Sequence, residues 1–425
     1  MRYKPESFDI WEYLCGKMYE PLIRCRIDFQ GRIDEEALMR AITLSLGTIP
    51  QMGCCFDGSG RKPRWVDKGF TGTDMVRVIE ADDNPDDEIF HALSSIIDVE
   101  SEPQLKIGIV RTPGGDTMCV VVSHLVCDTA GFKDYLFLVA DIYTRLRHGR
   151  QLPEPHRYQR STKPLYTETN WLERMQILRT PEPVHEFSLA DETGVDFHTG
   201  ETMPFMEYRT LSPDVFSALK TFASAHQATV NDSLMALFAR AFCRETGTDH
   251  LAFTSTIDFR RFIPPGIPYG ITNYAGNCAC SISIDRGEPP EATFAKISSQ
   301  MQAYKTGKYS LRGAISWDVA VRLFSFARLK ENFTKYAPVP IVAFTNLGIL
   351  DPAELDFDGA SIRSAYLTAS IKPRPYFQLT ASTFEGSCTL CCNVYGSPQE
   401  QQFADRVLDD IAGEITELPT SSNLG

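Results

Sequence analysis

Short runs of alternating apolar and polar residues recur along this chain, and stretches with helical spacing lie between them. In the N-terminal part the pattern predicts strands at 21 to 29, 105 to 110 and 117 to 123, with a further strand from Pro50, and helices at 34 to 46 and 132 to 146. Acidic residues open the first of these helices, where they complement the positive end of the helix dipole. This part therefore combines helices with half-buried strands.

The C-terminal part repeats the mixture. The pattern predicts strands at 251 to 258, 277 to 284, 341 to 346, 362 to 369, 376 to 384 and 387 to 395, and helices at 213 to 225, 229 to 245 and 398 to 417. Ser212 and Pro213 form a typical start for the first of these helices, with serine at the N-cap and proline at the first helical position.

Between the two parts, periodicity fades from 151 to 200 and prolines accumulate, with one short helix expected at 171 to 178. A chain of 425 residues is also too long for one ordinary core. We expect an α+β protein of two comparable lobes: an N-terminal lobe over 1–165, a crossover linker over 166–200 and a C-terminal lobe over 201–425.

Composition narrows the functional classes. The net charge is −13, and no Lys/Arg cluster alternates with aromatic residues, so the sequence predicts no nucleic-acid partner. No window approaches the ~20 apolar residues of a membrane span, and the N-terminus lacks the apolar region of a secretion signal. The twelve cysteines are too sparse for a disulfide scaffold. We expect a cytoplasmic protein with no membrane span.

Two cysteine groups raise the question of a metal site. Cys54-Cys55 stands alone, and Cys388, Cys391 and Cys392 form C-x-x-C-C. A structural zinc site needs four ligands, and no histidine lies near either group. Packing as small hydrophobic residues in strands is the better interpretation, and we expect no metal.

One motif carries candidate chemistry. Ser123-His124-Leu125-Val126-Cys127-Asp128 directly follows the apolar run from Met118 to Val122, so His124 lies where a buried strand ends. A neutral imidazole there can accept a proton near pH 7. The alternative is a core histidine with satisfied hydrogen bonds. Ser123 is a weaker candidate, for a nucleophile. It is next to His124 in the sequence, but adjacent strand residues point to opposite faces of the sheet.

Four segments together resemble the superfamily of chloramphenicol acetyltransferases, peptide-synthetase condensation domains and alcohol O-acyltransferases. They are Ile23–Phe29 with the helix that follows, the His-x-x-x-Asp motif of His124 and Asp128, the Asp-x-Arg segment Asp258-Phe259-Arg260 before Asn273, and Thr345-Asn346-Leu347-Gly348. They occur in the family's order and span nearly the whole chain. The resemblance implies two chloramphenicol-acetyltransferase-like lobes with an active-site tunnel between them.

The resemblance also implies an activity: transfer of an acyl group from a thioester to a hydroxyl or amine. His124 would be the general base. The donor would be acyl-CoA or an acyl-phosphopantetheinyl carrier protein, the acceptor a small alcohol or amine, and no permanently bound cofactor would be needed. Asp128 would form a structural pair with Arg260, the alternative being an exposed aspartate at a helix start. Asn346 would donate a hydrogen bond between the lobes, or would be an ordinary turn asparagine.

The chain departs from the family pattern at two positions. Ser123 replaces the first histidine of the usual His-His-x-x-x-Asp-Gly, and Thr129 replaces the glycine. Glycine would let a backbone N–H approach a tetrahedral intermediate, so Thr129 puts that donor in question. A catalytically silent condensation-like module that binds a carrier protein or another partner is therefore the alternative function.

Overall fold

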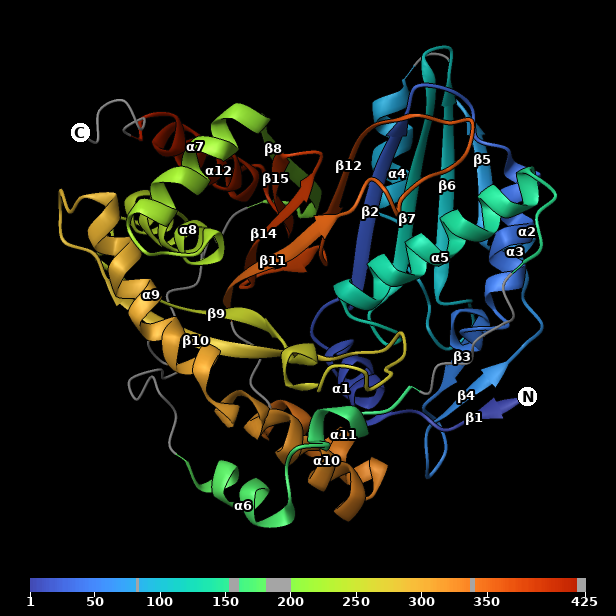
Figure 1. Cartoon of the computed structure of the whole chain (residues 1–425), viewed down its shortest axis with the longest axis horizontal. Helices are drawn as coiled ribbons and strands as arrows, with labels where there is room; N and C mark the ends of the chain where they lie inside the picture. The colour runs from blue at the N-terminus through green and yellow to red at the C-terminus, as the bar shows by residue number, and fades with distance from the viewer. Residues whose placement is uncertain (82–83, 153–159, 181–199, 337–340, 419–425) are drawn as a thin grey trace.

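The computed structural model describes residues 1–81, 84–152, 160–180, 200–336 and 341–418. Two large sheets organise these residues into two lobes that lie side by side (Figure 1). Much of the predicted crossover, 153–159 and 181–199, lies outside the described residues.

The sheet of the N-terminal lobe has five strands. Their spatial order is β12 (Ile362–Thr368), β2 (Leu22–Phe29), β7 (Gly115–Ser123), β6 (Leu105–Thr112) and β5 (Val76–Glu80). A smaller sheet nearby has the order β1 (Arg2–Tyr3), β4 (Arg64–Asp67) and β3 (Cys54–Asp57). Strand β12 comes from the C-terminal half of the sequence and pairs antiparallel with β2, so the chain crosses back to complete the first sheet.

The sheet of the C-terminal lobe has seven strands. Its order is β10 (Ala275–Ser283), β9 (His250–Asp258), β11 (Val342–Leu350), β14 (Phe377–Phe384), β15 (Ser387–Gly396) and β13 (Lys372–Pro373), with β8 (Met203–Leu211) also paired to β15. Strand β11 runs parallel to both of its neighbours.

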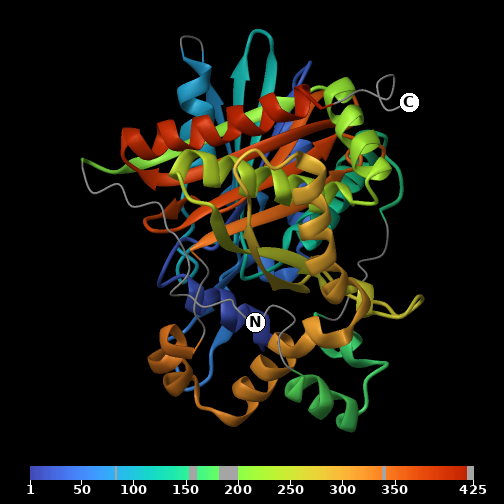
Figure 2. The same ribbon diagram turned by 90° about the vertical axis from the view of Figure 1, so that its left-hand side faces the viewer.

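Most helices pack against these sheets. In the N-terminal lobe they are α1 (Ser7–Cys15), α2 (Glu35–Ser45), α3 (Gly72–Met75), α4 (Pro85–Leu93) and α5 (Thr129–Arg147). The remaining helices are α6 (Trp171–Arg179), α7 (Pro213–Ala225), α8 (Val230–Thr246), α9 (Pro290–Thr306), α10 (Arg312–Leu323), α11 (Phe326–Tyr336) and α12 (Pro398–Thr416). Of these, α6, α10 and α11 lie together beside the sheets (Figure 1). Helix α12, red in Figure 2, packs against β15 and β8 of the second sheet.

The apolar run before His124 has a structural reason: strand β7 is buried on both faces. Val120 packs in the main core of the lobe, which includes Phe132 of α5, while the adjacent Cys119 packs with Leu93 of α4. A strand covered on both faces shows continuous rather than alternating apolar residues. The residue after this strand is therefore held on a rigid support.

The predicted α+β class with two lobes is confirmed, and every predicted helix and strand has a counterpart at nearly the predicted place. One boundary was wrong: residues Pro50–Gly53 form a 3₁₀ turn, and the strand begins only at Cys54. The proline fixes φ and supplies no N–H to a ladder, which suits the start of a turn.

The cysteines lie in the interior. All twelve are free and buried, and those of the C-x-x-C-C group pack along β15. Among the residues that the structure describes, no three histidine, cysteine or carboxylate side chains gather in a way that could hold a metal ion. Within the same residues, no helix is both long and apolar enough to cross a membrane.

Candidate active site

A cavity of about 1390 Å³ lies between the lobes, and both lobes supply its walls. All four residues singled out from the sequence line it: His124, Asp128, Arg260 and Asn346. Ser123 is not among the lining residues; it is buried, and its Oγ accepts a hydrogen bond from the backbone N–H of Leu125. A nucleophilic role for Ser123 is therefore not compatible with its position.

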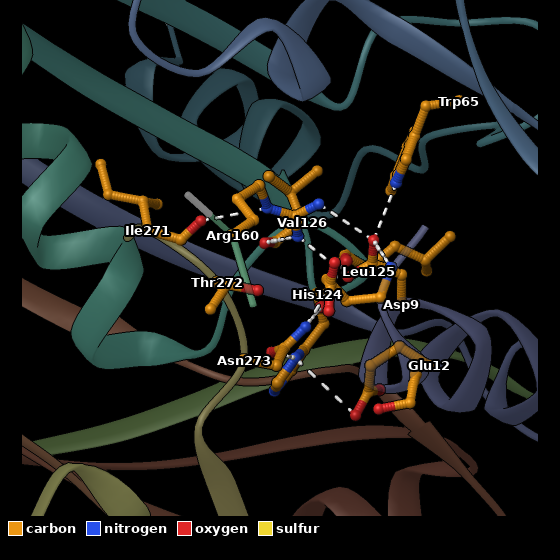
Figure 3. Close-up of polar contacts among 12 residues, drawn as sticks. Asp9, Glu12, Trp65, His124, Leu125, Val126, Arg160, Ile271, Thr272 and Asn273 are labelled. Atoms are coloured by element: carbon orange, nitrogen blue, oxygen red, sulfur yellow. Dashed lines mark hydrogen bonds and ion pairs between the residues drawn. The ribbon is translucent and has the colours of Figure 1, made fainter. Parts of the chain in front are cut away.

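His124 is held from both lobes. Its backbone N–H donates to the carbonyl of Pro21 at 2.8 Å, which fixes the residue directly after β7. From the other lobe, the Asn273 side-chain amide donates to the carbonyl oxygens of His124 at 2.8 Å and Leu125 at 3.4 Å. Figure 3 shows Asn273 lying against the imidazole.

This arrangement determines which ring nitrogen carries the hydrogen. The Nδ1 atom of His124 lies 3.1 Å from Oδ1 of Asn273. The Nδ2 group of Asn273 faces two carbonyls, so its Oδ1 is the atom that meets the ring, and an amide oxygen can only accept. Nδ1 is therefore the donor, and Nε2 of the neutral ring keeps its lone pair.

A carboxylate also lies beside the ring. Oε1 of Glu12, on α1, is 3.9 Å from Nδ1 of His124, and only 14% of the Glu12 side chain is exposed (Figure 3). Burial raises the pKa of the Glu12 carboxyl, against the opposing influence of the nearby His124 and Lys372. When ionised, this carboxylate stabilises a positive charge on the imidazole.

Asp128 and Arg260 form a bidentate ion pair that joins the lobes. Two N–H···O contacts of 2.8 Å link the guanidinium to the two carboxylate oxygens. The same carboxylate accepts backbone hydrogen bonds from Gly131 at 2.9 Å and Tyr274 at 2.7 Å. Asp128 is thus both the N-cap of α5 and the partner of Arg260. Among the described residues, no hydrogen bond joins its carboxylate to the imidazole of His124.

The charge of Asp128 is strongly favoured. Burial acts to raise the pKa of its carboxyl, but the Arg260 charge and the hydrogen bonds outweigh burial and hold the pKa below its usual value. The Arg260 guanidinium also lies over the ring of Tyr274, 5.0 Å from its centroid. A buried, fully hydrogen-bonded carboxylate of this kind suits a structural tie better than proton transfer.

Asn346 makes a local contact. Its Oδ1 accepts a hydrogen bond from the backbone N–H of Gly348 at 2.9 Å, where β11 has an irregular register. Gly348 has φ +83°, and a side chain there would meet Nζ of Lys133. The contact is therefore local to a bulge within β11, and it is neither a hydrogen bond donated between the lobes nor the contact of a turn asparagine.

Comparisons with solved structures identify the fold. No family model and no curated protein matches the sequence. Among solved structures, the chain is similar to the epimerization domain from the third module of tyrocidine synthetase B, with a TM-score of 0.68 and 13% identity over 98% of this chain and 96% of that one. It is also similar to the first condensation domain of the CDA synthetase, with a TM-score of 0.67 and 15% identity over 99% of both chains.

A third similar structure is an acetyltransferase. Trichothecene 15-O-acetyltransferase from Fusarium sporotrichioides gives a TM-score of 0.69 and 11% identity over 97% of this chain and 95% of that one. The chain has the fold of condensation domains and acyltransferases. At these identities the likeness shows the fold alone, and the whole length of the chain takes part in it.

Within this condensation-domain fold, Thr129 replaces a motif glycine without strain. It is the first residue of α5 and lines the cavity, and it is not among the non-glycine residues with positive φ, which in the described part of the chain are Gln227 and Glu385. Any L-residue can adopt a negative φ there. The backbone of this chain therefore does not require glycine at 129.

Sequence reasoning gave no role to Glu12, Asn273 or Arg160. Arg160 forms a bidentate pair with Asp9 of α1 at 2.9 Å and donates to the carbonyls of Val126 and Ile271, so it ties α1 to the loop that carries His124 (Figure 3). Asn273 was only part of a quoted segment. Nothing local in the sequence marks Glu12 or Arg160, because their neighbours are far away along the chain.

Proposed function

We propose that this protein transfers an acyl group from a thioester of coenzyme A or of a carrier protein to a hydroxyl or amine of a small molecule, with His124 as the general base. One observation carries the proposal. The hydrogen bond to Asn273 leaves the lone pair of Nε2 free on a histidine that lines the cavity between the lobes. That is the protonation state a general base needs.

The chemical step follows from these positions. Nε2 accepts the proton of the hydroxyl or amine as the oxygen or nitrogen attacks the thioester carbonyl carbon. The tetrahedral intermediate then collapses, the C–S bond breaks, and the thiolate leaves with the proton from the imidazolium. During this step the Glu12 carboxylate, 3.9 Å from Nδ1, stabilises the imidazolium.

The Asp128–Arg260 pair contributes to this function by position. It connects the first residues of α5 with the segment that carries Asn273, so it keeps His124 and its partner in register. An acyl transfer agrees with the activity named for the similar acetyltransferase and with the condensation domains among the similar structures.

The test is thioester turnover, with a panel of acyl-CoAs and small alcohols and amines and products identified by mass spectrometry. His124→Ala should lower kcat at least ~10²-fold, as expected for loss of a general base, with an unchanged melting temperature. His148→Ala is the matched control, because His148 is well exposed, lies outside the cavity walls and should leave turnover unchanged. Near-wild-type turnover by His124→Ala would overturn the proposal, and binding of a carrier protein without any turnover would favour a silent module.

A further inference from the structure

A second buried cation lines the cavity. Lys372, at the start of β13, is only 7% exposed and forms part of the cavity wall. Its Nζ lies 3.9 Å from the ring centroid of Tyr19 and 5.8 Å from that of Tyr376. Within the part of the chain that the structure describes, this ammonium group forms no ion pair and donates no hydrogen bond.

The backbone around Lys372 is fixed from both lobes. The N–H of Ile371 donates to the Glu20 carboxylate at 2.8 Å, in the segment that precedes β2. Lys372 itself pairs in parallel with Val394 of β15. The ammonium group is therefore presented at a defined place in the cavity wall, and it is not the end of a mobile surface side chain.

The groups around Lys372 do not provide its ammonium group with an ion-pair partner among the described residues. Glu12 of α1 is a carboxylate that influences the Lys372 charge, but Glu12 is the neighbour of His124 and forms no ion pair with Lys372. Cys15 and Tyr19 have pKa values raised well above the usual range by burial, so they are neutral. Contacts with two aromatic faces stabilise an ammonium group less than its burial destabilises it.

We propose that Lys372 is an anion-binding residue of this cavity and that a carboxylate on one of the two substrates pairs with it. The proposal rests on the proposed function only in taking the cavity as the substrate site. A carboxylate would fit both the charge and the three free donors of the ammonium group. It could belong to the acyl chain or to the acceptor, and the experiment separates these sources.

The experiment measures equilibrium binding with matched pairs of probes. Succinyl-CoA and butyryl-CoA differ by a carboxylate in place of a methyl group at the end of the acyl chain, and 4-hydroxybutyrate and 1-butanol differ in the same way on the acceptor side. Dissociation constants come from calorimetry for the thioesters and from ligand-observed NMR for the alcohols. We expect the carboxylate probe of one pair to bind at least ten-fold more tightly than its partner, and that pair identifies the source.

Variants then assign the preference to Lys372. Lys372→Met and Lys372→Gln should each reduce the ratio of the two dissociation constants in that pair to about one. Lys330→Met is the matched control and should keep it, since Lys330 also lies over two aromatic rings but donates to the Gly58 carbonyl and does not line the cavity. Two results would overturn the proposal. In one, the wild type binds neither carboxylate probe measurably, or binds each no more tightly than its uncharged partner. In the other, the preference for the carboxylate survives in either Lys372 variant. Because the readout is binding, a chain without turnover would still give an answer.

Discussion

Arg260, which is largely buried, and Lys372, which is buried, are two cations in the wall of one cavity, and they differ in what balances their charge. Each lies over two tyrosine rings. Arg260 also has a bidentate carboxylate partner, Asp128, whereas Lys372 has no ion-pair partner among the described residues. The two cations therefore have similar aromatic surroundings, but only Arg260 is paired with a carboxylate.

The pKa values follow this difference. Burial acts against the charge of Arg260, but Asp128 outweighs burial and the pKa of Arg260 is raised. Burial lowers the pKa of Lys372 to about 8, and the influence of Cys15 and Glu12 only partly opposes burial. The paired cation therefore ties the lobes together, while the unpaired cation is costly to the fold and is explained best by a ligand.

The largest expected effect is the loss of Asp128. Asp128→Ala leaves the Arg260 guanidinium buried without its partner, so the free energy of unfolding should fall by about 3–5 kcal/mol, measured by urea denaturation. This is a large share of the ~5–15 kcal/mol of a typical domain.

A double-mutant cycle separates pairing from independent contributions. Arg260→Ala should produce a similar loss, and the double variant should be less destabilised than the sum of the two single variants. Strictly additive losses would show that the two side chains do not stabilise each other.

A smaller effect is expected when the charge at 260 is kept. Arg260→Lys retains a cation but cannot form the bidentate pair, and a loss of about 1.5–3 kcal/mol is expected, the range for one hydrogen bond to a charged group. Thermal unfolding monitored by circular dichroism would measure it. If the free energy of unfolding falls as much as in Asp128→Ala, the bidentate geometry of the guanidinium, rather than its charge, would provide most of the stabilisation.

The smallest effect on stability should come from Lys372. Lys372→Met removes an unpaired buried charge and keeps the apolar length, so the free energy of unfolding at pH 7 should stay within about 1 kcal/mol of wild type or rise. A loss comparable to that of Arg260→Lys would remove the distinction between the two cations.

The pH dependence sharpens this prediction. The folded pKa of Lys372, about 8, lies below the ~10.4 of an unfolded chain, so between these values the unfolded chain binds the additional proton. Wild type should therefore gain stability relative to Lys372→Met as pH rises from 8 toward 10. Parallel stability curves for the two proteins over this range would contradict the lowered pKa.

Arg260, the paired cation, could be singled out from the sequence, whereas Lys372, the unpaired cation, could not. Asp128 and Arg260 lie in short motifs that resemble those of a known superfamily, and that resemblance implied their pairing although 132 residues separate them. Lys372 lies in no motif, and its burial depends on how β13 joins the second sheet. The same holds for Glu12, because its helix α1 was not predicted and its neighbour His124 comes from another element.

Strand pairing shows the same limit. The alternation at 362 to 369 predicted a strand, but no local pattern could reveal that β12 joins the N-terminal sheet beside β2. Helix α9 is a different kind of omission, since Phe294, Ile297, Met301 and Tyr304 have helical spacing and are buried. That signal was present in the sequence, whereas the partner of β12 depends on contacts between distant segments.

The central claim is that Asn273 holds His124 with hydrogen on Nδ1 and a free lone pair on Nε2. ¹⁵N NMR of histidine-labelled protein at pH 8 tests this most directly, with the His124 signals identified by their loss in His124→Gln. We expect a protonated Nδ1 and an unprotonated Nε2, and Asn273→Ala should shift the ring toward a mixture of the two tautomers. A wild-type ring with hydrogen on Nε2 would contradict the proposed general base.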